Sequence, residues 1–130
     1  SVELIAHFID EIVKKYPIDE SNIALIGFSQ GAILSYATAL TYPEKVTKVV
    51  ALSGYLNQEI IPEVLDTKAI SHLKFFISHG SADQVIPVDW ARKAKPALEK
   101  LGLETEYQEY PIGHGVSPKN FFDFKVWLTK

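Results

Sequence analysis

The chain has no cysteine, so disulfide bonds, thiol catalysis and cysteine-ligated zinc are excluded within its 130 residues. It also has no apolar run that approaches the ~18–20 residues of a membrane-spanning helix. Its 13 basic side chains are outnumbered by 16 acidic ones, and the net charge of −3 provides no basic face for nucleic acid. No signal peptide is visible, so we expect a cytoplasmic protein. Hydrophobic residues make up 47% of the chain and charged residues 22%, which indicates a globular domain rather than a disordered segment.

What the sequence does contain is an alternation of helical and strand patterns. Apolar residues recur at helical spacing up to Pro17 and predict an amphipathic helix. Continuous apolar runs at residues 22–26, 46–52 and 73–78 predict strands buried on both faces, as in a parallel sheet. The more polar residues 105–110 predict a fourth strand at a sheet edge.

Helices are predicted between and after these strands, at residues 30–41, at about 88–101 and from Ser117-Pro118 onward. Residues 53–71 form the one long irregular stretch. Alternating strands and helices predict right-handed βαβ units and a parallel sheet. The chain opens with a helix, which in such a fold follows a strand. We therefore expect residues 1–130 to form one partial α/β domain with about four strands and flanking helices.

The helix ends carry recognisable signals. Ser117 and Pro118 suit the N-cap and first position of the last helix. Asp89 and Gly102 are predicted as the N-cap of the 88–101 helix and the residue after its C-cap. Pro96 lies inside that helix, where its missing N–H predicts a kink or a break.

The most specific motif is Gly27-Phe28-Ser29-Gln30-Gly31, which matches Gly-x-Ser-x-Gly between a predicted strand and a predicted helix. A nucleophilic serine on a tight strand-to-helix turn needs flanking residues without bulk, because the backbone is strained and the neighbouring chain is close. The helix N-terminus behind it offers backbone N–H groups to a developing oxyanion. We interpret Ser29 as a candidate nucleophile rather than as part of a plain tight turn.

A serine hydroxyl needs a base to act as a nucleophile, and the chain has four histidines. His7 lies on the first predicted helix and His72 lies before the third strand; both are interpreted as surface or cap residues. His79 follows the third strand. His114 lies in Gly113-His114-Gly115 after the fourth strand, where flanking glycines let a loop hold the imidazole in a cleft at the carboxyl edge of the sheet. His114 is the predicted base.

The base in turn needs a carboxylate that fixes the imidazole tautomer. Asp83 lies just past the third strand, at the same sheet edge as Ser29 and His114. The other aspartates are predicted at a helix cap, on helices or in turns away from strand ends: Asp89, Asp10, Asp123, Asp19 and Asp66. The chain order Ser29, Asp83, His114 is the order expected of an α/β-hydrolase.

Four segments together resemble the carboxylesterase/phospholipase family of α/β-hydrolases, which includes the acyl-protein thioesterases. They are residues 26–32, 51–56, 79–87 and 113–116, and they occur in family order along the whole chain. The resemblance implies an α/β-hydrolase fold with Ser29, Asp83 and His114 as the catalytic residues and the Gln30 N–H as one oxyanion donor. It also implies hydrolysis of carboxylic esters or thioesters without a metal or a cofactor.

The sequence also departs from this family. The resemblance implies an N-terminal half with several strands and a loop that supplies the second oxyanion N–H, and neither is present here. Loss of one such donor typically costs ~10²–10³ in rate. The strand at residues 22–27 would then present a bare apolar edge, which invites pairing. We expect these residues to be part of a longer polypeptide whose N-terminal half is the partner, with a homodimer as a further option.

Apolar residues near the candidate catalytic groups are candidates for an acyl pocket: Tyr55, Leu56, Val85, Ile86 and Val116. The alternative is that these side chains only close the core at the loop ends. No basic cluster points to an anionic head group, so small, short-chain esters are the expected substrates. Lysophospholipid or acyl-protein thioester substrates are implied by the resemblance alone.

Two other interpretations stay open. A non-catalytic half-domain that serves assembly or interaction would explain the missing oxyanion loop and the uncovered strand, but it has no physical need for the three candidate catalytic residues. A dienelactone hydrolase-like or peptidase-like enzyme would share those residues and differ in the leaving group.

Overall fold

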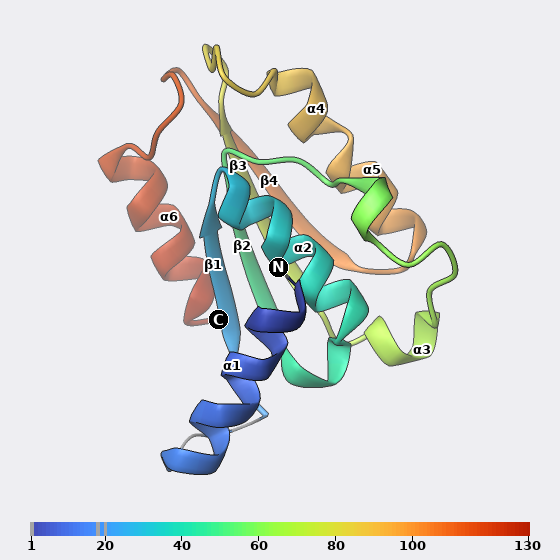
Figure 1. Ribbon diagram of the computed structural model, residues 1–130. Helices are drawn as coiled ribbons and strands as arrows, with labels where there is room; N and C mark the ends of the chain where they lie inside the picture. The colour runs from blue at the N-terminus through green and yellow to red at the C-terminus, as the bar shows by residue number, and fades with distance from the viewer. Residues whose placement is uncertain (1, 18, 20) are drawn as a thin grey trace.

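The centre of the molecule is a four-stranded parallel sheet (Figure 1), seen in a computed structural model that describes residues 2–17, 19 and 21–130. The strands follow one another across the sheet in chain order: β1 (Ala24–Phe28), β2 (Lys48–Leu52), β3 (Lys74–Gly80) and β4 (Glu104–Tyr110). All three neighbouring pairs are parallel. The prediction of a parallel α/β sheet with a polar fourth strand at its edge is therefore confirmed.

Helices cover both faces of the sheet. They are α1 (Val2–Lys15), α2 (Gln30–Thr41), α3 (Thr67–Ile70), α4 (Val88–Arg92), α5 (Ala94–Lys100) and α6 (Pro118–Leu128), with short 3-10 turns η1 (Pro43–Lys45) and η2 (Gln58–Ile60). α2 packs on β1 and β2, α1 packs on α2, and α5 packs on β4. α6 stands apart from these on the other face (Figure 1).

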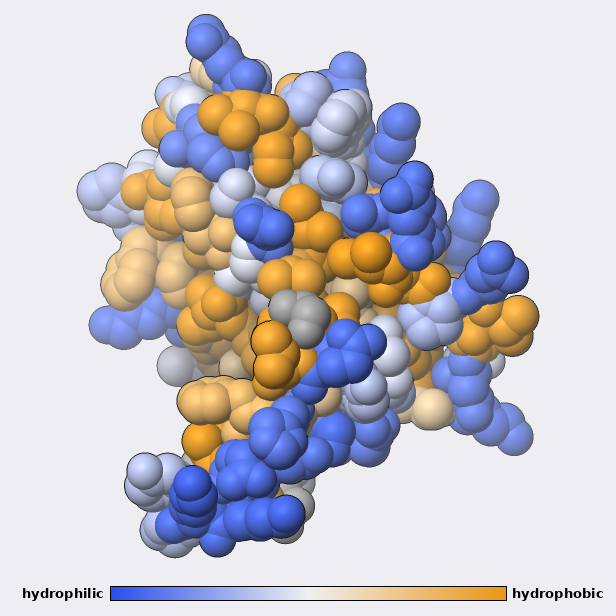
Figure 2. Space-filling view, in the orientation of Figure 1, coloured by the Kyte–Doolittle hydropathy of each residue, from blue (hydrophilic) through white to orange (hydrophobic). Residues whose placement is uncertain are grey.

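Side chains alternate between two apolar clusters along the central strands. Val49 and Phe75 belong to the larger cluster under α2 and α5, whereas Val50 and Phe76 face Trp127 of α6. This alternation explains why β2 and β3 read as continuous apolar runs, since both faces of each strand are buried. Hydrophobic residues also reach the surface over the middle of the face that carries α2, while the outer part of α1 is hydrophilic (Figure 2). None of the described helices is long and apolar enough to cross a membrane.

β1 departs from the prediction of a strand buried on both faces. Ile26 and Phe28 are 53% and 43% exposed, although they pair in register with the buried Val50 and Leu52. The reason is that α6 packs over β2 and β3, and no described element covers the same face of β1. Within this chain β1 is an edge strand with one apolar face open.

The predicted helix at 88–101 is broken, as expected, but the break lies at Lys93 rather than at Pro96. A proline cannot donate to the carbonyl four residues earlier, here that of Arg92, so the interruption falls before the ring. Asp89 was predicted as an N-cap and this is wrong: Pro87 takes that position, and Asp89 lies in the first turn of α4, bonded to Arg92.

Other predicted helix ends are confirmed. Ser117 caps α6 by accepting a hydrogen bond from the Asn120 N–H, with Pro118 as the first helical residue. Gly102 has a φ of 81° and donates to the Glu99 carbonyl, while Leu103 N–H donates to that of Leu98, which is a Schellman ending for α5. The stretch at residues 53–71 is less irregular than expected, because it contains η2 and α3.

Candidate active site

Three loops at the carboxyl edge of the sheet bring the candidate residues together. Ser29 follows β1, Asp83 follows β3 and His114 follows β4. His114 Nδ1 lies 2.7 Å from Asp83 Oδ2, and His114 Nε2 lies 3.0 Å from Ser29 Oγ. Because a carboxylate only accepts, Nδ1 carries the ring proton and Nε2 is left to accept from the Ser29 hydroxyl. The three side chains are thus joined by two consecutive hydrogen bonds.

Ser29 lies on a sharp turn between β1 and α2. Its backbone has φ 57° and ψ −116°, a left-handed conformation that is strained for a residue with a side chain. Its N–H donates to the Leu52 carbonyl at 2.8 Å, which ties the turn to the end of β2. A side chain on Gly27 would clash with the backbone of Gly31, so the strand and helix can approach only because Gly27 has none. The turn thus projects Oγ toward His114.

The N-terminus of α2 lies directly behind Ser29. Ser29 occupies the N-cap position, yet its side chain makes no capping hydrogen bond, which leaves Oγ to His114. Gln30 is the first helical residue, and N–H groups of a first helical turn have no acceptor within the helix. A backbone donor and the positive end of the helix dipole therefore lie next to the hydroxyl.

Asp83 is held as a carboxylate by several donors. Oδ1 accepts the N–H groups of Val85 and Ile86 at 2.8 and 2.9 Å, and Oδ2 faces His114. The side chain is completely shielded from solvent. Burial by itself would raise the pKa of Asp83, but the hydrogen bonds from His114 and from the two backbone amides outweigh burial and lower that pKa. Asp83 is consequently ionised at neutral pH.

The His114 loop is fastened to the end of β3 by its backbone. Ser81 N–H donates to the Tyr110 carbonyl at 2.8 Å and Ala82 N–H to that of Ile112 at 3.0 Å. Gly80 passes so close to this loop that a side chain there would overlap its carbonyl groups. The two loops that carry Asp83 and His114 are therefore fixed relative to each other.

Two residues around His114 were not singled out from the sequence. The Phe28 ring packs against the His114 ring with centroids 4.9 Å apart and planes tilted by 47°. Ser53, at the end of β2, has a left-handed φ of 57° like Ser29, and its hydroxyl lies 3.4 Å from the Gly115 carbonyl. The sequence did carry a signal for Ser53, because it is a polar residue directly after a buried strand. It carries no signal for the orientation of the Phe28 ring.

His7 and His72 lie where the sequence indicated, whereas His79, predicted to follow the third strand, lies within β3. His7 is exposed on α1, 3.9 Å from Glu11, and the largely exposed His72 bonds the Pro43 and Val46 carbonyls. His79 is buried beside Asp83 and does not reach Ser29 by any hydrogen bond of the described residues. The other aspartates all have structural partners: Asp10 with Lys45, Asp19 with Ser21, Asp66 at the α3 N-cap, Asp89 with Arg92 and Asp123 with Tyr110.

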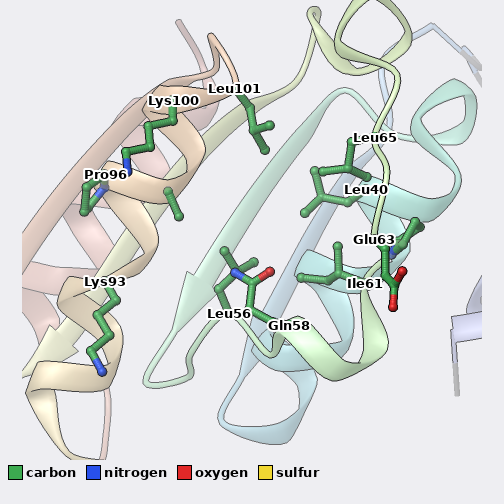
Figure 3. Close-up of a pocket in the computed structure, with 12 residues that line it drawn as sticks. Leu40, Leu56, Gln58, Ile61, Glu63, Leu65, Lys93, Pro96, Lys100 and Leu101 are labelled. Atoms are coloured by element: carbon green, nitrogen blue, oxygen red, sulfur yellow. The ribbon is translucent and has the colours of Figure 1, made fainter.

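The candidate acyl-pocket residues do not share one described cleft. Tyr55 stacks edge-on against Trp90 at 5.1 Å, and both line a cleft of about 390 Å³ together with Leu56. Leu56 also lines a cleft of about 470 Å³ that extends between residues 56–65 and α5, with Lys93 and Lys100 at its rim (Figure 3). Ile86 is buried, whereas Val85 and Val116 are exposed.

In the part of the chain that the structure describes, no group of three or more histidine, aspartate and glutamate side chains is arranged to hold a metal ion.

A parallel sheet that gathers a serine, an aspartate and a histidine, in that chain order, at its carboxyl edge defines the class of the α/β-hydrolases. Solved structures agree with this class. A variant of SOBER1 from Arabidopsis thaliana superposes with a TM-score of 0.83 at 25% identity, over 98% of this chain and 61% of that one. A Bacillus cereus carboxylesterase superposes with a TM-score of 0.87 at 21% identity, over 98% of this chain and 58% of that one.

The chain belongs to the phospholipase/carboxylesterase family, whose model matches residues 1–130. Acyl-protein thioesterase 1 of Debaryomyces hansenii is 32% identical over 126 residues, which cover 95% of this chain and 54% of that protein. A probable carboxylesterase of Oryza sativa subsp. japonica is 30% identical over 118 residues, which cover 85% of this chain and 42% of that protein. The resemblance inferred from the motifs is confirmed, and the chain spans about half the length of the curated relatives it matches.

Proposed function

We propose that residues 1–130 form the catalytic C-terminal part of a serine hydrolase that cleaves carboxylic esters or thioesters. The observation that carries the proposal is the continuous hydrogen-bond chain from Ser29 Oγ through the imidazole of His114 to the buried carboxylate of Asp83. Membership of a family whose members are named as carboxylesterases and acyl-protein thioesterases supports the same reaction class.

In the proposed mechanism, His114 Nε2 takes the proton of Ser29 as Oγ attacks the acyl carbonyl carbon. Asp83 keeps the imidazole in the required tautomer and stabilises the imidazolium that forms. The oxyanion is stabilised by the Gln30 N–H at the start of α2. His114 then gives its proton to the departing alcohol or thiol, and a water molecule repeats the steps on the acyl-enzyme.

The acyl group of the substrate is proposed to lie beside Tyr55 and Leu56, which follow the end of β2. The remaining candidates are Val85, Ile86 and Val116; of these, Ile86 faces the core and serves the site through its backbone. We expect short-chain esters to be good substrates. An anionic head group is not expected, because Lys93 and Lys100 at the rim of the cleft beside Leu56 are accompanied there by Glu63. A marked preference for acyl chains beyond about eight carbons would contradict this part of the proposal.

We further propose that a segment outside residues 1–130 covers β1 and supplies the second oxyanion donor. Two observations support this. Ile26 and Phe28 leave an apolar face of β1 open beside the site, and the curated relatives are about twice as long as this chain. Pairing of two copies through β1 is the competing arrangement. Limited proteolysis and intact mass of the natural polypeptide separate the two, since only the first requires extra chain on this face.

The central test uses the natural polypeptide, with any segment it carries beyond these residues. Intact mass is measured before and after reaction with a fluorophosphonate, and hydrolysis of a short-chain aryl ester is followed in parallel. One adduct and ester turnover are expected, and both should disappear in Ser29→Ala and persist in the surface control Ser71→Ala. Turnover retained in Ser29→Ala would overturn the proposal. A folded protein without any adduct would favour the non-catalytic assembly module instead.

A further inference from the structure

His79 is a buried histidine that the proposed mechanism does not use. It lies near the end of β3, is 1% exposed, and its Nε2 atom is 2.8 Å from the Ile86 carbonyl oxygen and 3.3 Å from Asp83 Oδ2. Carbonyl and carboxylate oxygens only accept hydrogen bonds, so the ring proton of His79 is on Nε2. A single N–H therefore faces both the Ile86 carbonyl and the carboxylate oxygen that binds His114.

The His79 N–H also binds the turn formed by residues 83–86, which itself binds Asp83 through two backbone N–H groups. Residues 83–86 fold back so that the Val85 and Ile86 N–H groups bind Asp83 Oδ1. His79 binds the carbonyl of the same Ile86, so the turn is held at its far end as well. With Oδ1 fixed by two amides, rotation of the carboxylate would move Oδ2 away from both His79 and His114.

Packing alone does not account for a histidine at this position. His79 Nδ1 is buried and has no hydrogen-bond partner among the described residues. A buried polar atom without a partner costs free energy, which an apolar side chain in the same place would avoid. The polar atom that is used, Nε2, is the one directed at the Asp83 turn.

Two carboxylates lie near His79, and Asp83 is the one that faces its N–H. Asp83 faces it from the loop after β3, and Glu109 is its register partner on β4. The Glu109 carboxylate is engaged by Arg92 of α4 at 2.7 and 2.8 Å and by the Tyr107 hydroxyl at 2.9 Å. His114 binds the same carboxylate oxygen, Asp83 Oδ2, through its Nδ1 atom.

We propose that His79 is a positioning residue for Asp83: its Nε2–H, shared between the Ile86 carbonyl and Asp83 Oδ2, keeps that oxygen directed at His114 Nδ1. The role rests on the proposed function, because the direction of Oδ2 matters for turnover only if His114 is the base. His79 itself touches no reacting atom and is therefore not a catalytic residue.

The test compares His79→Gln with His79→Asn in the natural polypeptide. The amide nitrogen of glutamine reaches about as far as Nε2, whereas that of asparagine reaches only as far as Nδ1. We expect the Asn variant to lose kcat by about 10- to 100-fold with KM nearly unchanged, as for one hydrogen bond to a charged group, and the Gln variant to recover most of it. Equal kcat values in the two folded variants would overturn the proposal.

His72 provides the matched control for a purely structural histidine. Its Nε2 atom also faces two oxygen atoms, here the backbone carbonyls of Pro43 and Val46, but it lies before β3, at the end of the sheet away from the candidate site. His72→Asn should lower the unfolding temperature without lowering kcat. Turnover that is lost in Ser29→Ala but unchanged in both His79 variants would remove the role of His79 and leave the proposed function standing. Turnover that survives Ser29→Ala would remove both.

Discussion

The backbone of Gly31 fills the space in which a side chain on Gly27 would begin. A Cβ atom on Gly27 would overlap the Gly31 carbonyl group and lie 2.7 Å from the Ala32 amide nitrogen, whereas a Cβ atom on Gly31 would meet no described atom within 4 Å. The two glycines of the Gly-x-Ser-x-Gly motif therefore differ. Of these two glycines, Gly27 is the one required for the close approach of β1 and α2.

Gly27→Ala is expected to be far more harmful than Gly31→Ala. The first forces β1 and α2 apart, which should destabilise the fold by about 1–3 kcal/mol or more and displace Ser29. The second adds a methyl group to open space in the first turn of a helix, where alanine is favoured over glycine by up to about 1 kcal/mol. Urea unfolding and the rate of fluorophosphonate labelling measure the two effects. Equal stability of the two variants would contradict the assignment of the close contact to Gly27.

Backbone strain at Ser29 predicts a conflict between stability and activity. A side chain at φ 57° and ψ −116° costs about 1–3 kcal/mol, and only glycine adopts this conformation freely. Ser29→Gly should therefore unfold at a higher temperature than Ser29→Ala, although both lack the hydroxyl and should fail to react with the probe. Differential scanning calorimetry provides the comparison. An Ala variant at least as stable as the Gly variant would show that the turn stores no strain.

Much of the fold could be predicted because its signals are local. The apolar runs of β2 and β3 and the caps at Ser117 and Gly102 depend on residues close in sequence. The open face of β1 could not be read in the same way, since Ile26 and Phe28 have the composition of a buried strand. What covers a strand depends on elements elsewhere in the polypeptide, and α6 reaches only β2 and β3.

The candidate site was predictable to the extent that topology fixes it. Ser29, Asp83 and His114 each follow a strand, and parallel strands end at the same edge of a sheet, so their proximity follows from chain order. The packing of Phe28 on His114 and the contact of His79 with the Asp83 turn depend on side-chain direction and on the pairing of two loops. Neither leaves a periodic or spacing signal.

The lowered pKa of Asp83 predicts how stability changes in acid. A carboxylate whose pKa is lower in the folded state binds fewer protons there than in the unfolded chain. Its contribution is complete above the unfolded pKa of about 3.9 and is lost as the pH falls through the folded pKa. Asp83→Asn cannot titrate, so its stability deficit should be largest near pH 7 and shrink below about pH 4. Thermal unfolding at several pH values tests this; a deficit independent of pH would contradict it.

Tyr36 is the opposite case, because it has a buried polar group whose removal should stabilise the fold. Its hydroxyl has no hydrogen-bond partner among the described residues, and burial, with a smaller effect from Tyr107, raises its pKa. Tyr36→Phe should therefore stabilise the fold by about 1 kcal/mol near neutral pH, because the desolvated hydroxyl is removed while the ring stays against Phe75.

The same substitution should change the response to alkali. A raised folded pKa means that the stability due to the neutral phenol is complete below the unfolded pKa of about 10 and is lost as the pH rises above it. Urea unfolding at pH 7 and above pH 10 should show a larger gain for Tyr36→Phe at the higher pH. Tyr16→Phe is the matched control, because Tyr16 is 60% exposed and should show no gain at either pH. If Tyr36→Phe instead destabilises the protein at pH 7, the hydroxyl has a hydrogen-bond partner in the folded protein and the prediction is wrong.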